Sequence, residues 1–294
     1  MSWASKLSKP YRVKDGGKFR LKDFDPAGTG NIHSKPHAKK MLEQGIASMT
    51  ELQDKLYAQD SWALLLIFQG IDAAGKDGLV KHVMSGVNPQ GCEVHSFKQP
   101  STEEIDHDYL WRAAQRLPRR GQIGIFNRSY YEEVLVVRVH AALLKNERIP
   151  ETLVGKGLWK ERFEDIKAWE KYLAHNGTVI RKFFLHLSKE EQKRRFLARL
   201  EEPEKNWKFS SSDVRERQYW DDYAQAYEEM IAHTSTRQAP WYVVPADNKW
   251  FTRVVVAAAI VATLEDLKLS YPKLDAAEQK RLSEAKAGLE KQKD

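Results

Sequence analysis

Residues 63–76 read ALLLIFQGIDAAGK, a short apolar run followed by a glycine-containing loop and a lysine. The run Ala63–Phe68 is typical of a buried parallel strand. From Gly70 to Lys76 the sequence matches the pattern G-x-x-x-x-G-K. In this pattern, backbone N–H groups surround phosphate oxygens, while the lysine and the start of the next helix add positive charge. The stretch therefore predicts a phosphate-binding loop between a strand and a helix, called the phosphate loop below (residues 70–76).

Strand-like and helical segments alternate along the rest of the chain. Further strand-like runs occupy residues 93–97, 123–126, 178–187 and 241–245, and helical patterns occupy 33–59, 102–115, 129–139, 153–175, 189–200, 213–233 and 249–267. This alternation predicts an α/β fold with a doubly wound, five-stranded parallel sheet flanked by helices. Because ligands of such sheets bind at the carboxyl ends of the strands, the loops after Phe68, Phe97, Phe126 and Leu187 should surround one site.

Composition narrows the class of protein. The 294 residues include 48 Lys or Arg and 41 Asp or Glu, for a net charge of +7, and this balance suits either an anionic partner or a solubilising surface. Cys92 is the single cysteine and excludes an intrachain disulfide. The longest apolar run, Val254–Ala262, is too short to span a membrane, and the basic N-terminus lacks the apolar core of a signal peptide. We expect a cytoplasmic protein without a membrane partner.

The chain divides into two regions. Residues 1–32 predict a basic, irregular N-terminal arm, because the first 22 residues contain seven Lys or Arg and one Asp. Residues 33–294 predict a single domain, which ends in a charged surface helix at 276–291. The helices predicted at 33–59 and 249–267 each contain apolar residues that could support self-association.

The phosphate loop contains an unusual carboxylate. Asp72 lies inside the loop, and Asp77 follows the lysine where Ser or Thr is expected. A carboxylate beside phosphates is repelled unless a cation lies between them, so Asp72 is a candidate Mg²⁺ ligand and Asp77 is a second candidate. The alternative for Asp77 is a first-turn carboxylate that the helix dipole favours.

A second group of polar residues follows the strand predicted at 123–126. Enzymes with such loops often place a carboxylate that positions Mg²⁺ at this strand end, but here the position is Asn127. Glu132 could supply the missing charge, and Arg128 would face the transferred phosphate. The alternatives are a helix cap for Asn127 and a surface ion pair between Arg128 and Glu132.

Residues 190–217 mix eight Lys or Arg with seven acids, and residues 201–212 form a polar break between two helices. Such a segment suits a mobile lid that carries cations over a phosphate. A solvated helical hairpin is the alternative.

Several motifs resemble those of the polyphosphate kinase 2 family. Residues 68–78 (FQGIDAAGKDG) resemble its phosphate loop, and residues 126–132 (FNRSYYE) resemble its second motif. Its lid signature is matched by residues 207–210 (WKFS) with Asp213, Arg217, Trp220 and Tyr223. Shorter matches occur at 88–91, 97–100, 110–112 and 239–247, so the resemblance covers about residues 33–268 in order.

This resemblance implies a thymidylate-kinase-like P-loop kinase fold with a helical lid at about 190–217. It implies Mg²⁺-dependent, reversible phosphoryl transfer between inorganic polyphosphate and the adenine nucleotides AMP, ADP and ATP, with guanine nucleotides as further candidates. The commoner second motif of the family has Asp where this chain has Asn127. The combination of Asn127 with Glu132 resembles the subgroup that phosphorylates both AMP and ADP. A homo-oligomer, either a dimer or a tetramer, is also expected, and no nucleic-acid partner is.

The resemblance also assigns residue roles. Asp72 would bind Mg²⁺, Lys76 and Arg128 would contact the transferred phosphate, and Asn127 and Glu132 would orient or help coordinate the acceptor side; these five are the candidate catalytic residues. Phosphate or polyphosphate would be bound by Gly70, Ala73, Ala74, Gly75 and Asp77, together with Lys76. The remaining candidates are Arg194, Arg199, Lys208 and Arg217 for polyphosphate or lid closure, Asn88, Lys98 and Arg112 for the nucleotide, and Glu164 facing the site.

Two other functions fit part of the sequence. An ATP-dependent nucleoside or nucleotide kinase of the same fold would explain the phosphate loop and the strand pattern, but not Asp72 or the lid motif. A non-catalytic binder of nucleic acid or another polyanion would fit the basic arm and the nine Trp and eleven Tyr. Such a binder would not need Asp72 beside Lys76.

Overall fold

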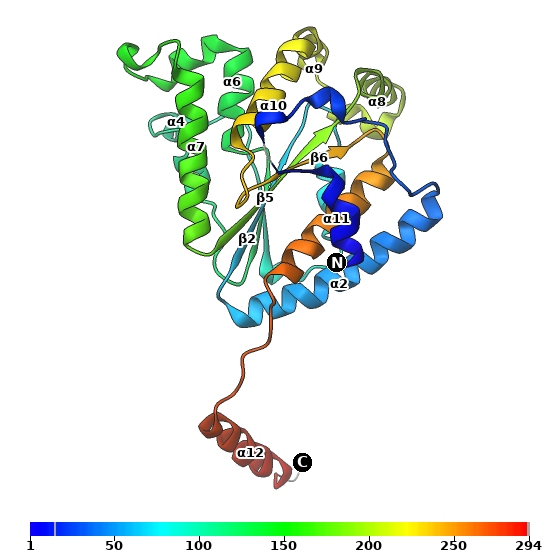
Figure 1. Ribbon diagram of the computed structural model, residues 1–294, viewed down its shortest axis with the longest axis vertical. Coiled ribbons are helices and arrows are strands. Elements are labelled where there is room, and N and C mark those ends of the chain that lie inside the picture. Colours follow the sequence, from blue (N-terminus) through cyan, green and yellow to red (C-terminus); the bar gives the residue numbers. More distant parts are fainter. Residues whose placement is uncertain (15, 293–294) are drawn as a thin grey trace.

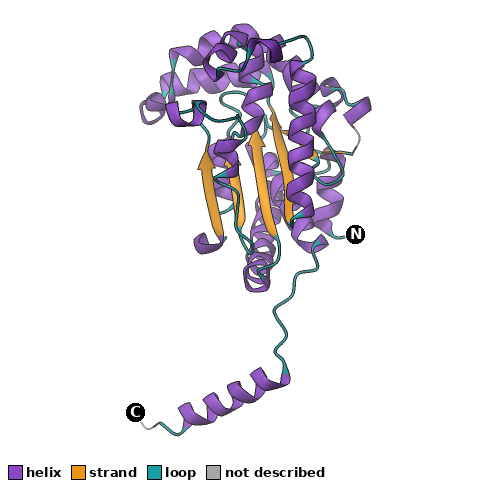
Figure 2. Cartoon of the chain, turned by 90° about the vertical axis from the view of Figure 1, so that its left-hand side faces the viewer, coloured by secondary structure: helices purple, strands orange, loops and turns teal. Residues whose placement is uncertain are grey.

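The computed structural model describes residues 1–14 and 16–292, except the side chains of Lys205 and Lys208. Within these residues, six strands form one sheet in the order β1-β6-β5-β2-β4-β3. The strands are β1 (Arg12–Val13), β2 (Ala63–Gln69), β3 (Cys92–Ser96), β4 (Ile123–Asn127), β5 (Thr178–His186) and β6 (Trp241–Pro245). Neighbours among β2 to β6 are parallel, which confirms the predicted strands, and their carboxyl ends lie at one edge (Figure 2).

Helices cover both faces of the sheet (Figure 1). On one face lie α1 (Trp3–Ser8), α2 (Lys35–Gln59), α3 (Lys76–Val83) and α11 (Lys249–Asp266), and on the other lie α7 (Leu158–His175) and α10 (Trp220–Thr234). Strand β2 separates the two cores, because Leu64 and Leu66 pack with the first set of helices while Leu65 and Ile67 pack with the second. This alternation follows from the period of two along a strand and confirms the doubly wound architecture.

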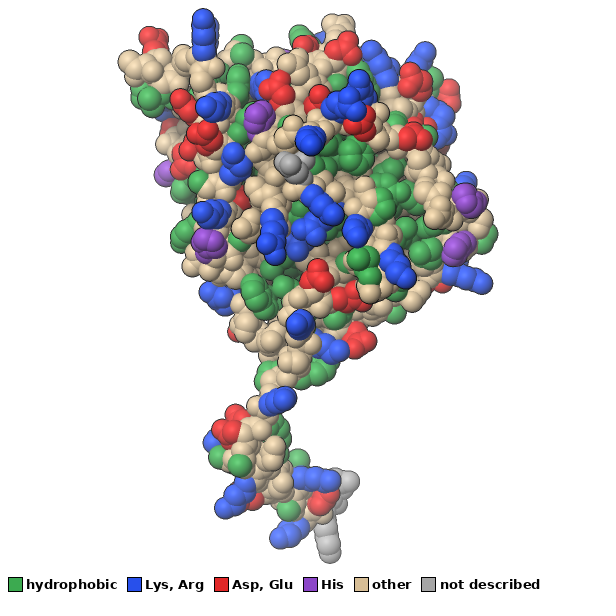
Figure 3. Space-filling view, in the orientation of Figure 1, with side chains coloured by type: hydrophobic (Ala, Val, Ile, Leu, Met, Phe, Trp, Pro, Cys, Tyr) green, Lys and Arg blue, Asp and Glu red, His purple; other side chains and the backbone are tan. Residues whose placement is uncertain are grey.

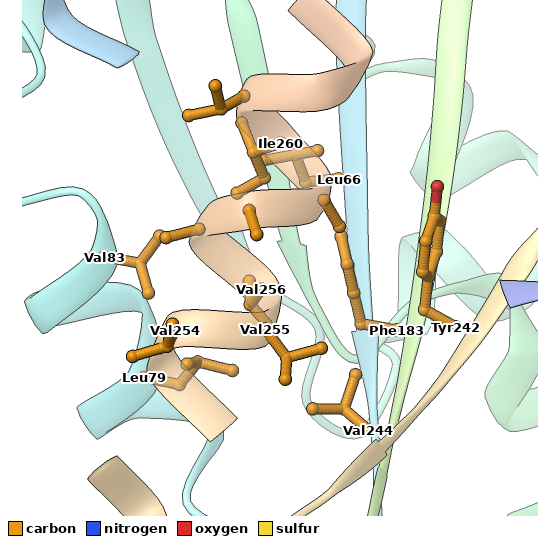
Figure 4. Close-up of a cluster of buried hydrophobic side chains, with 14 of the residues drawn as sticks. Leu66, Leu79, Val83, Phe183, Tyr242, Val244, Val254, Val255, Val256 and Ile260 are labelled. Carbon is orange, nitrogen blue, oxygen red and sulfur yellow. The ribbon is translucent and has the colours of Figure 1, made fainter. Parts of the chain in front are cut away.

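Helix α11 is the most buried helix of the first layer. Val254, Val255, Val256 and Ile260 are at most 1% exposed and lie against β2, β5 and β6 through Leu66, Phe183 and Val244 (Figure 4). Three consecutive β-branched residues disfavour a helix intrinsically, so burial of this apolar surface stabilises it instead. The apolar residues of α11 are therefore used inside the chain and are not available for self-association.

The N-terminal residues are more regular than the predicted arm. Strand β1 pairs antiparallel with β6, so the sheet has one strand more than the five predicted. Helix α1 packs on α11 through Ala4, which is fully buried. Ala4 and Val13 are buried, and Trp3, Leu7 and Tyr11 pack against the same core as Ala4, so apolar contacts hold this basic segment on the body. Figure 3 shows Lys and Arg side chains gathered near the centre of the face that this segment crosses.

The remaining helices are short or peripheral. They are α4 (Thr102–Ile105), α5 (Trp111–Ala114), α6 (Val136–Val139), α8 (Lys189–Glu201), α9 (Ser211–Glu216) and α12 (Ala276–Glu290), with 3₁₀ turns at Lys9–Tyr11, Gly16–Lys18, Leu21–Asp23, Pro89–Gly91, Tyr130–Val134, Ala141–Glu147, Glu151–Leu153, Pro203–Lys208 and Arg217–Tyr219. The helix predicted over 102–115 is divided because Asp108 accepts a hydrogen bond from the Leu110 N–H and forms a turn.

Helix α12 is exposed along its whole length and stands away from the body (Figures 1 and 2). This confirms the predicted surface helix at the C-terminal end. In the described part of the chain, no helix is both long and apolar enough to cross a membrane.

Candidate active site

The phosphate loop connects β2 to α3. Its backbone bends through three residues with positive φ, Gly70 at 159°, Ala73 at 63° and Gly75 at 98°. Gly75 is the N-cap of α3, and a left-handed backbone at this position favours glycine. The loop thereby places the first turn of α3, where backbone N–H groups lack helical partners, at the carboxyl edge of the sheet.

Lys76 is folded back into the loop. Its Nζ donates to the carbonyl oxygen of Gly70 at 2.6 Å and to that of Ile71 at 3.4 Å. Burial, and to a smaller extent the positive charge of Arg128, lower the pKa of Lys76 to about 8, although the nearby carboxylates oppose this shift. A buried ammonium group held only by carbonyl oxygens would be stabilised by an anion, which is the role expected for this residue.

Arg128 joins the second motif to the phosphate loop. Its Nη2 donates to Asp72 Oδ1 at 2.7 Å and its Nη1 donates to Glu132 Oε2 at 2.8 Å. The charge of Glu132, and to a smaller extent that of Asp72, raises the pKa of Arg128 against the effect of burial. Three of the predicted catalytic residues therefore form one charged cluster, and the ion pair between Arg128 and Glu132 lies in the site and not on an open surface.

Asn127 contacts a different carboxylate. Its Nδ2 donates to Asp77 Oδ1 at 2.5 Å, with Ser96 Oγ at 3.5 Å. The helix-cap role considered for Asn127 is filled by Ser129, whose Oγ accepts from the N–H of Tyr131. Asn127 thus links the end of β4 to the first turn of α3.

These groups face a cavity of about 640 Å³. It is lined by Asp72, Ala73, Ala74, Gly75, Lys76, Asp77, Gly78, Leu79, Ser96, Phe97, Lys98, Asn127, Arg128, Arg195, Ala198, Arg199, Lys249, Thr252 and Arg253. The lining comes from the segments that follow each of the strands β2 to β6. The structure therefore brings the loops after Phe68, Phe97, Phe126 and Leu187 to one site, as expected.

Helix α8 presents an arginine that sequence reasoning missed. Arg195 is buried, and its Nη1 donates to the carbonyl oxygens of Ala73 and Ala74 at 2.9 and 3.0 Å. The predicted Arg194 instead has a side chain 75% exposed, pairs with Glu191 and does not line the cavity. The signal was the helical period, since Arg195 shares the buried face of α8 with Gln192 and Phe196.

The lid residues connect to the phosphate loop in steps. Arg199 lines the cavity and pairs with Asp213 of α9 at 3.2 Å. Arg217 Nη1 donates to Gln192 Oε1 at 2.6 Å, and Gln192 Nε2 donates to the Asp72 carbonyl oxygen at 3.0 Å. Arg217 also lines a smaller cavity, of about 40 Å³, together with Asp72 and Arg128. Lys208 ends a 3₁₀ turn, and its side chain lies outside the described residues.

Two of the three nucleotide candidates lie near the cavity. Lys98 lines it, and the Arg112 guanidinium lies 5.0 Å from the ring centre of Phe97 and donates to the Lys98 carbonyl oxygen at 2.8 Å. Burial lowers the pKa of Arg112.

The structure does not bring Asn88, the third nucleotide candidate, or Glu164 to the cavity. Asn88 precedes β3, so it lies at the opposite end of the sheet, where its Oδ1 accepts from the Gln90 N–H. Glu164 is exposed on α7, with Lys160 at 4.0 Å.

A buried network supports the second motif from below. The hydroxyl groups of Tyr130 and Tyr131 both donate to Glu170 Oε1 at 2.7 Å. Lys182 Nζ donates to Glu170 Oε2 at 2.6 Å and to the Thr234 carbonyl oxygen at 2.8 Å. Glu170 and Lys182 are at most 1% exposed, so this ion pair fixes the backbone between Arg128 and Glu132. Sequence alone gave no signal for it, because the partners come from different elements.

The carboxylates suit a metal ion that arrives with phosphate. Among the residues described, no group of three or more His, Cys, Asp or Glu could hold a metal by itself. Mg²⁺ is commonly held by one or two carboxylates together with substrate phosphates and water. Asp72 and Asp77 line the same cavity as Lys76 and supply that number of carboxylates.

Comparisons with known proteins agree with this chemistry. The family model "Polyphosphate kinase 2 (PPK2)" matches residues 32–272. The chain is 50% identical over 283 residues to an ADP-polyphosphate phosphotransferase of Rhodopseudomonas palustris (96% of this chain, 98% of the relative), and 44% identical over 273 residues to an AMP/ADP-polyphosphate phosphotransferase of Meiothermus ruber (92% and 98%). The crystal structure of polyphosphate kinase 2 from Arthrobacter aurescens superposes with a TM-score of 0.86 at 39% identity, covering 96% of this chain and 98% of that one.

Proposed function

The chain belongs to the polyphosphate kinase 2 family and is a polyphosphate-dependent nucleotide phosphotransferase, and we propose that it phosphorylates both AMP and ADP, reversibly and with Mg²⁺. One observation carries the proposal: Arg128 links Asp72 of the phosphate loop to Glu132 of the second motif in the cavity region that holds Lys76. The relatives leave the acceptor open, since one is named for ADP and another for AMP and ADP.

Phosphoryl transfer depends mainly on positioning the two phosphates and on neutralising the charge between them. Lys76 and Arg128 supply two fixed positive charges on one wall of the cavity. Glu132 would keep the guanidinium of Arg128 oriented when Asp72 exchanges Arg128 for Mg²⁺. Mg²⁺ held by Asp72 and Asp77 would neutralise charge on the phosphate oxygens.

Asn127 supports the use of both acceptors. AMP and ADP differ by one charged phosphate, so a site for both must accept a variable negative charge near the end of β4. An amide at this position removes one repulsive charge, while its hydrogen bond to Asp77 keeps that carboxylate in place. Glu132 remains as the carboxylate of this motif and is compensated by Arg128.

We also propose that residues 190–217 close over the bound phosphates as a lid. Arg195 and Arg199 of α8 already line the cavity, and Arg217 is connected to the phosphate loop through Gln192. A lid excludes water, which would otherwise compete with the nucleotide for the transferred phosphoryl group.

The test is a donor and acceptor matrix. The full chain with Mg²⁺ receives AMP, ADP or GDP as acceptor and either long-chain polyphosphate or ATP as donor, and nucleotides are separated by chromatography. ADP and ATP should form from AMP with polyphosphate. Asp72→Asn should lose this activity, whereas Asp266→Asn, which changes an exposed carboxylate at the far end of α11, should retain it.

Each alternative has its own outcome. Turnover of ADP without any turnover of AMP would contradict the dual-acceptor proposal. Activity with ATP and none with polyphosphate would contradict the donor. Full activity after complete removal of divalent cations by EDTA would contradict the requirement for Mg²⁺.

A further inference from the structure

The lid joins the body of the molecule at residues 216–219, where α9 ends and α10 begins; these residues are called the lid root below. Two neighbouring side chains of the lid root contact different elements. Arg217 donates to Gln192 of α8, on the side of the phosphate loop. Glu216 instead accepts hydrogen bonds from α10 and from the end of α6. The lid root is therefore held from two sides.

His140 is the residue that reaches the lid root from α6. It is the C-cap of this helix, and its N–H donates to the Val136 carbonyl oxygen at 2.9 Å. Helix α6 follows directly after the 3₁₀ turn that contains Glu132. It is also fixed beside α10, because Arg138 pairs with Glu229 at 2.5 Å (Figure 1). The position of His140 is thus set by the elements that carry the second motif and α10.

Glu216 accepts two hydrogen bonds on one carboxylate oxygen. Nε2 of His140 lies 2.9 Å from Glu216 Oε2, and the hydroxyl group of Tyr223 donates to the same oxygen at 2.9 Å. A carboxylate can only accept, so Nε2 of His140 carries the proton. Burial and the hydrogen bond to Glu216 raise the pKa of Tyr223, so its hydroxyl group remains a donor. Both donors hold the carboxylate in one orientation.

The imidazole ring of His140 also packs against the lid root. Its edge meets the ring of Tyr219, with 4.7 Å between the ring centres and 75° between the planes. The side chains of His140 and Glu216 are 25% and 34% exposed, so their hydrogen bond is partly shielded from water. An edge-to-face contact together with a shielded hydrogen bond gives His140 a defined geometry with both ends of the lid root.

The lid root lies next to the charged cluster of the active site. Glu216 and Tyr223 line the smaller cavity, of about 40 Å³, together with Asp72 and Arg128. If the lid root moved away from α6, this cavity would open beside the pair of Asp72 and Arg128. Water could then enter at the phosphate loop. His140 is absent from the described lining of both cavities, so it would act on this region only through Glu216 and the lid root.

We propose that His140 is a positioning residue for phosphoryl transfer, which fixes the lid root through Glu216 and thereby keeps water from the transferred phosphoryl group. The inference rests on the proposed function, because it assumes that residues 190–217 act as a lid. The reaction that His140 suppresses is hydrolysis. There the terminal P–O–P bond of polyphosphate breaks, a P–O bond to the water oxygen forms, and inorganic phosphate and a proton are released.

The test measures how the phosphoryl group is divided between nucleotide and water. His140→Phe keeps an aromatic ring beside Tyr219 and removes the donor, whereas His140→Gln supplies an N–H donor again. Each variant receives long-chain polyphosphate, ADP and Mg²⁺, and ATP and inorganic phosphate are measured in the same samples. His140→Phe should lower kcat about fivefold to tenfold and raise the phosphate released per ATP by a similar factor, with both KM values within about twofold of the wild type. His140→Gln should recover most of the loss.

His175→Phe is the matched control, because His175 is exposed at the end of α7, at the opposite edge of the sheet. It should change neither kcat nor the release of phosphate. The double variant His140→Phe with Glu216→Ala should be no worse than Glu216→Ala alone, because both changes break one contact. Effects that multiply in the double variant would overturn the proposal. An unchanged division between ATP and phosphate in His140→Phe, or an equal loss in His140→Gln, would also overturn it.

Hydrogen exchange separates this inference from the proposed function. Amides of residues 211–219 should exchange about fivefold faster in His140→Phe than in the wild type, while those of β2 keep their rates. Unchanged exchange at 211–219, or faster exchange throughout the core, would show that His140 does not specifically fix the lid root. If the wild-type chain transfers no phosphoryl group from polyphosphate to any nucleotide, the proposed function fails. The exchange rates still decide whether His140 holds the lid root.

Discussion

The guanidinium of Arg128 lies 2.7 Å from the carboxylate of Asp72, which joins the end of β4 to the phosphate loop after β2. In this structure, Arg128 therefore neutralises the carboxylate proposed to bind Mg²⁺. Binding of phosphates with Mg²⁺ would exchange this pair for two new ones, Arg128 with phosphate and Asp72 with the cation. Glu132, 2.8 Å from the other side of the guanidinium, holds Arg128 during that exchange.

Replacing Asp72 by Asn should lower kcat with polyphosphate and ADP about 100-fold or more, because the cation loses its protein anchor at the transferred phosphate. The fold should be affected by less than about 1 kcal/mol, since Asp72 is partly exposed and Arg128 keeps Glu132. Steady-state kinetics over a series of Mg²⁺ concentrations, with urea unfolding alongside, measures both effects. If saturating Mg²⁺ fully restored kcat, Asp72 would contribute only to the affinity for Mg²⁺ and not to the transfer step.

Asn127→Asp should make stability depend on Mg²⁺. The substitution places a carboxylate where an amide now donates to Asp77 at 2.5 Å. Two unshielded carboxylates at this distance should lower the free energy of unfolding by roughly 1–2 kcal/mol at neutral pH. Added Mg²⁺, or a pH low enough to protonate one of the two carboxylates, should restore the free energy of unfolding. Thermal unfolding with and without Mg²⁺ measures the difference.

The swapped variant Asn127→Asp with Asp77→Asn is the control for this prediction. It rebuilds an amide and carboxylate pair in reverse, so it should recover most of the lost stability without Mg²⁺. Equal stability of the single and the swapped variants would show that repulsion between these two side chains is not the cause.

Much of this site could be predicted from sequence because its parts are local. The phosphate loop, Lys76 and the residues at the end of β4 each lie at a strand end, and parallel strands bring their carboxyl ends together. Asn88 could have been excluded on the same principle, since a residue that precedes a strand lies at the other edge of the sheet.

Other features depended on packing, which a single sequence does not reveal. Arg194 and Arg195 differ by one position on α8, and only the buried face of the helix decides which of them reaches the loop. The pairing of Glu170 with Lys182 joins α7 to β5, and no spacing rule connects them. Strand β1 has two residues, so its pairing with β6 gave no periodic signal.

The titration of Lys76 should appear in the pH profile of polyphosphate use. The pKa of Lys76 is lowered to about 8 in the free protein, so its ammonium group loses its proton above that pH. The value of kcat/KM for polyphosphate, which reports the free enzyme, should therefore fall as pH rises through about 8. Because bound phosphate stabilises the charged form, polyphosphate binding near pH 8 should also take up protons. Calorimetry in buffers of different ionisation enthalpy measures that uptake.

Lys76→Arg gives the control, because an arginine stays protonated throughout this range. Its activity should be lower in absolute terms, but the decline above about pH 8 should disappear. The titration of Lys76 should affect stability in the opposite direction to its effect on kcat/KM. The unfolded chain binds more protons between the lowered pKa of Lys76 and its ordinary value, so this residue should make the protein more stable as pH rises through that window.

The buried pair under the second motif should be more important for stability than any contact at the surface. Glu170→Gln leaves the ammonium group of Lys182 buried without a charged partner, which should cost about 3–5 kcal/mol in the free energy of unfolding. Tyr130→Phe removes one of the hydroxyl groups that donate to Glu170 and should cost about 1 kcal/mol. Urea unfolding of each variant, with the slope compared to the wild type, measures these values.

The same network should also affect catalysis. It does not contact the side chains of Arg128 and Glu132, but it fixes the backbone between them. Tyr130→Phe should therefore lower kcat by more than it raises the KM for either substrate, at a temperature where the variant stays folded. Lys160→Ala changes an exposed lysine of α7, the helix that carries Glu170, and should alter neither constant. If Tyr130→Phe kept the wild-type kcat while losing stability, the network would hold the fold together without setting the geometry of the second motif.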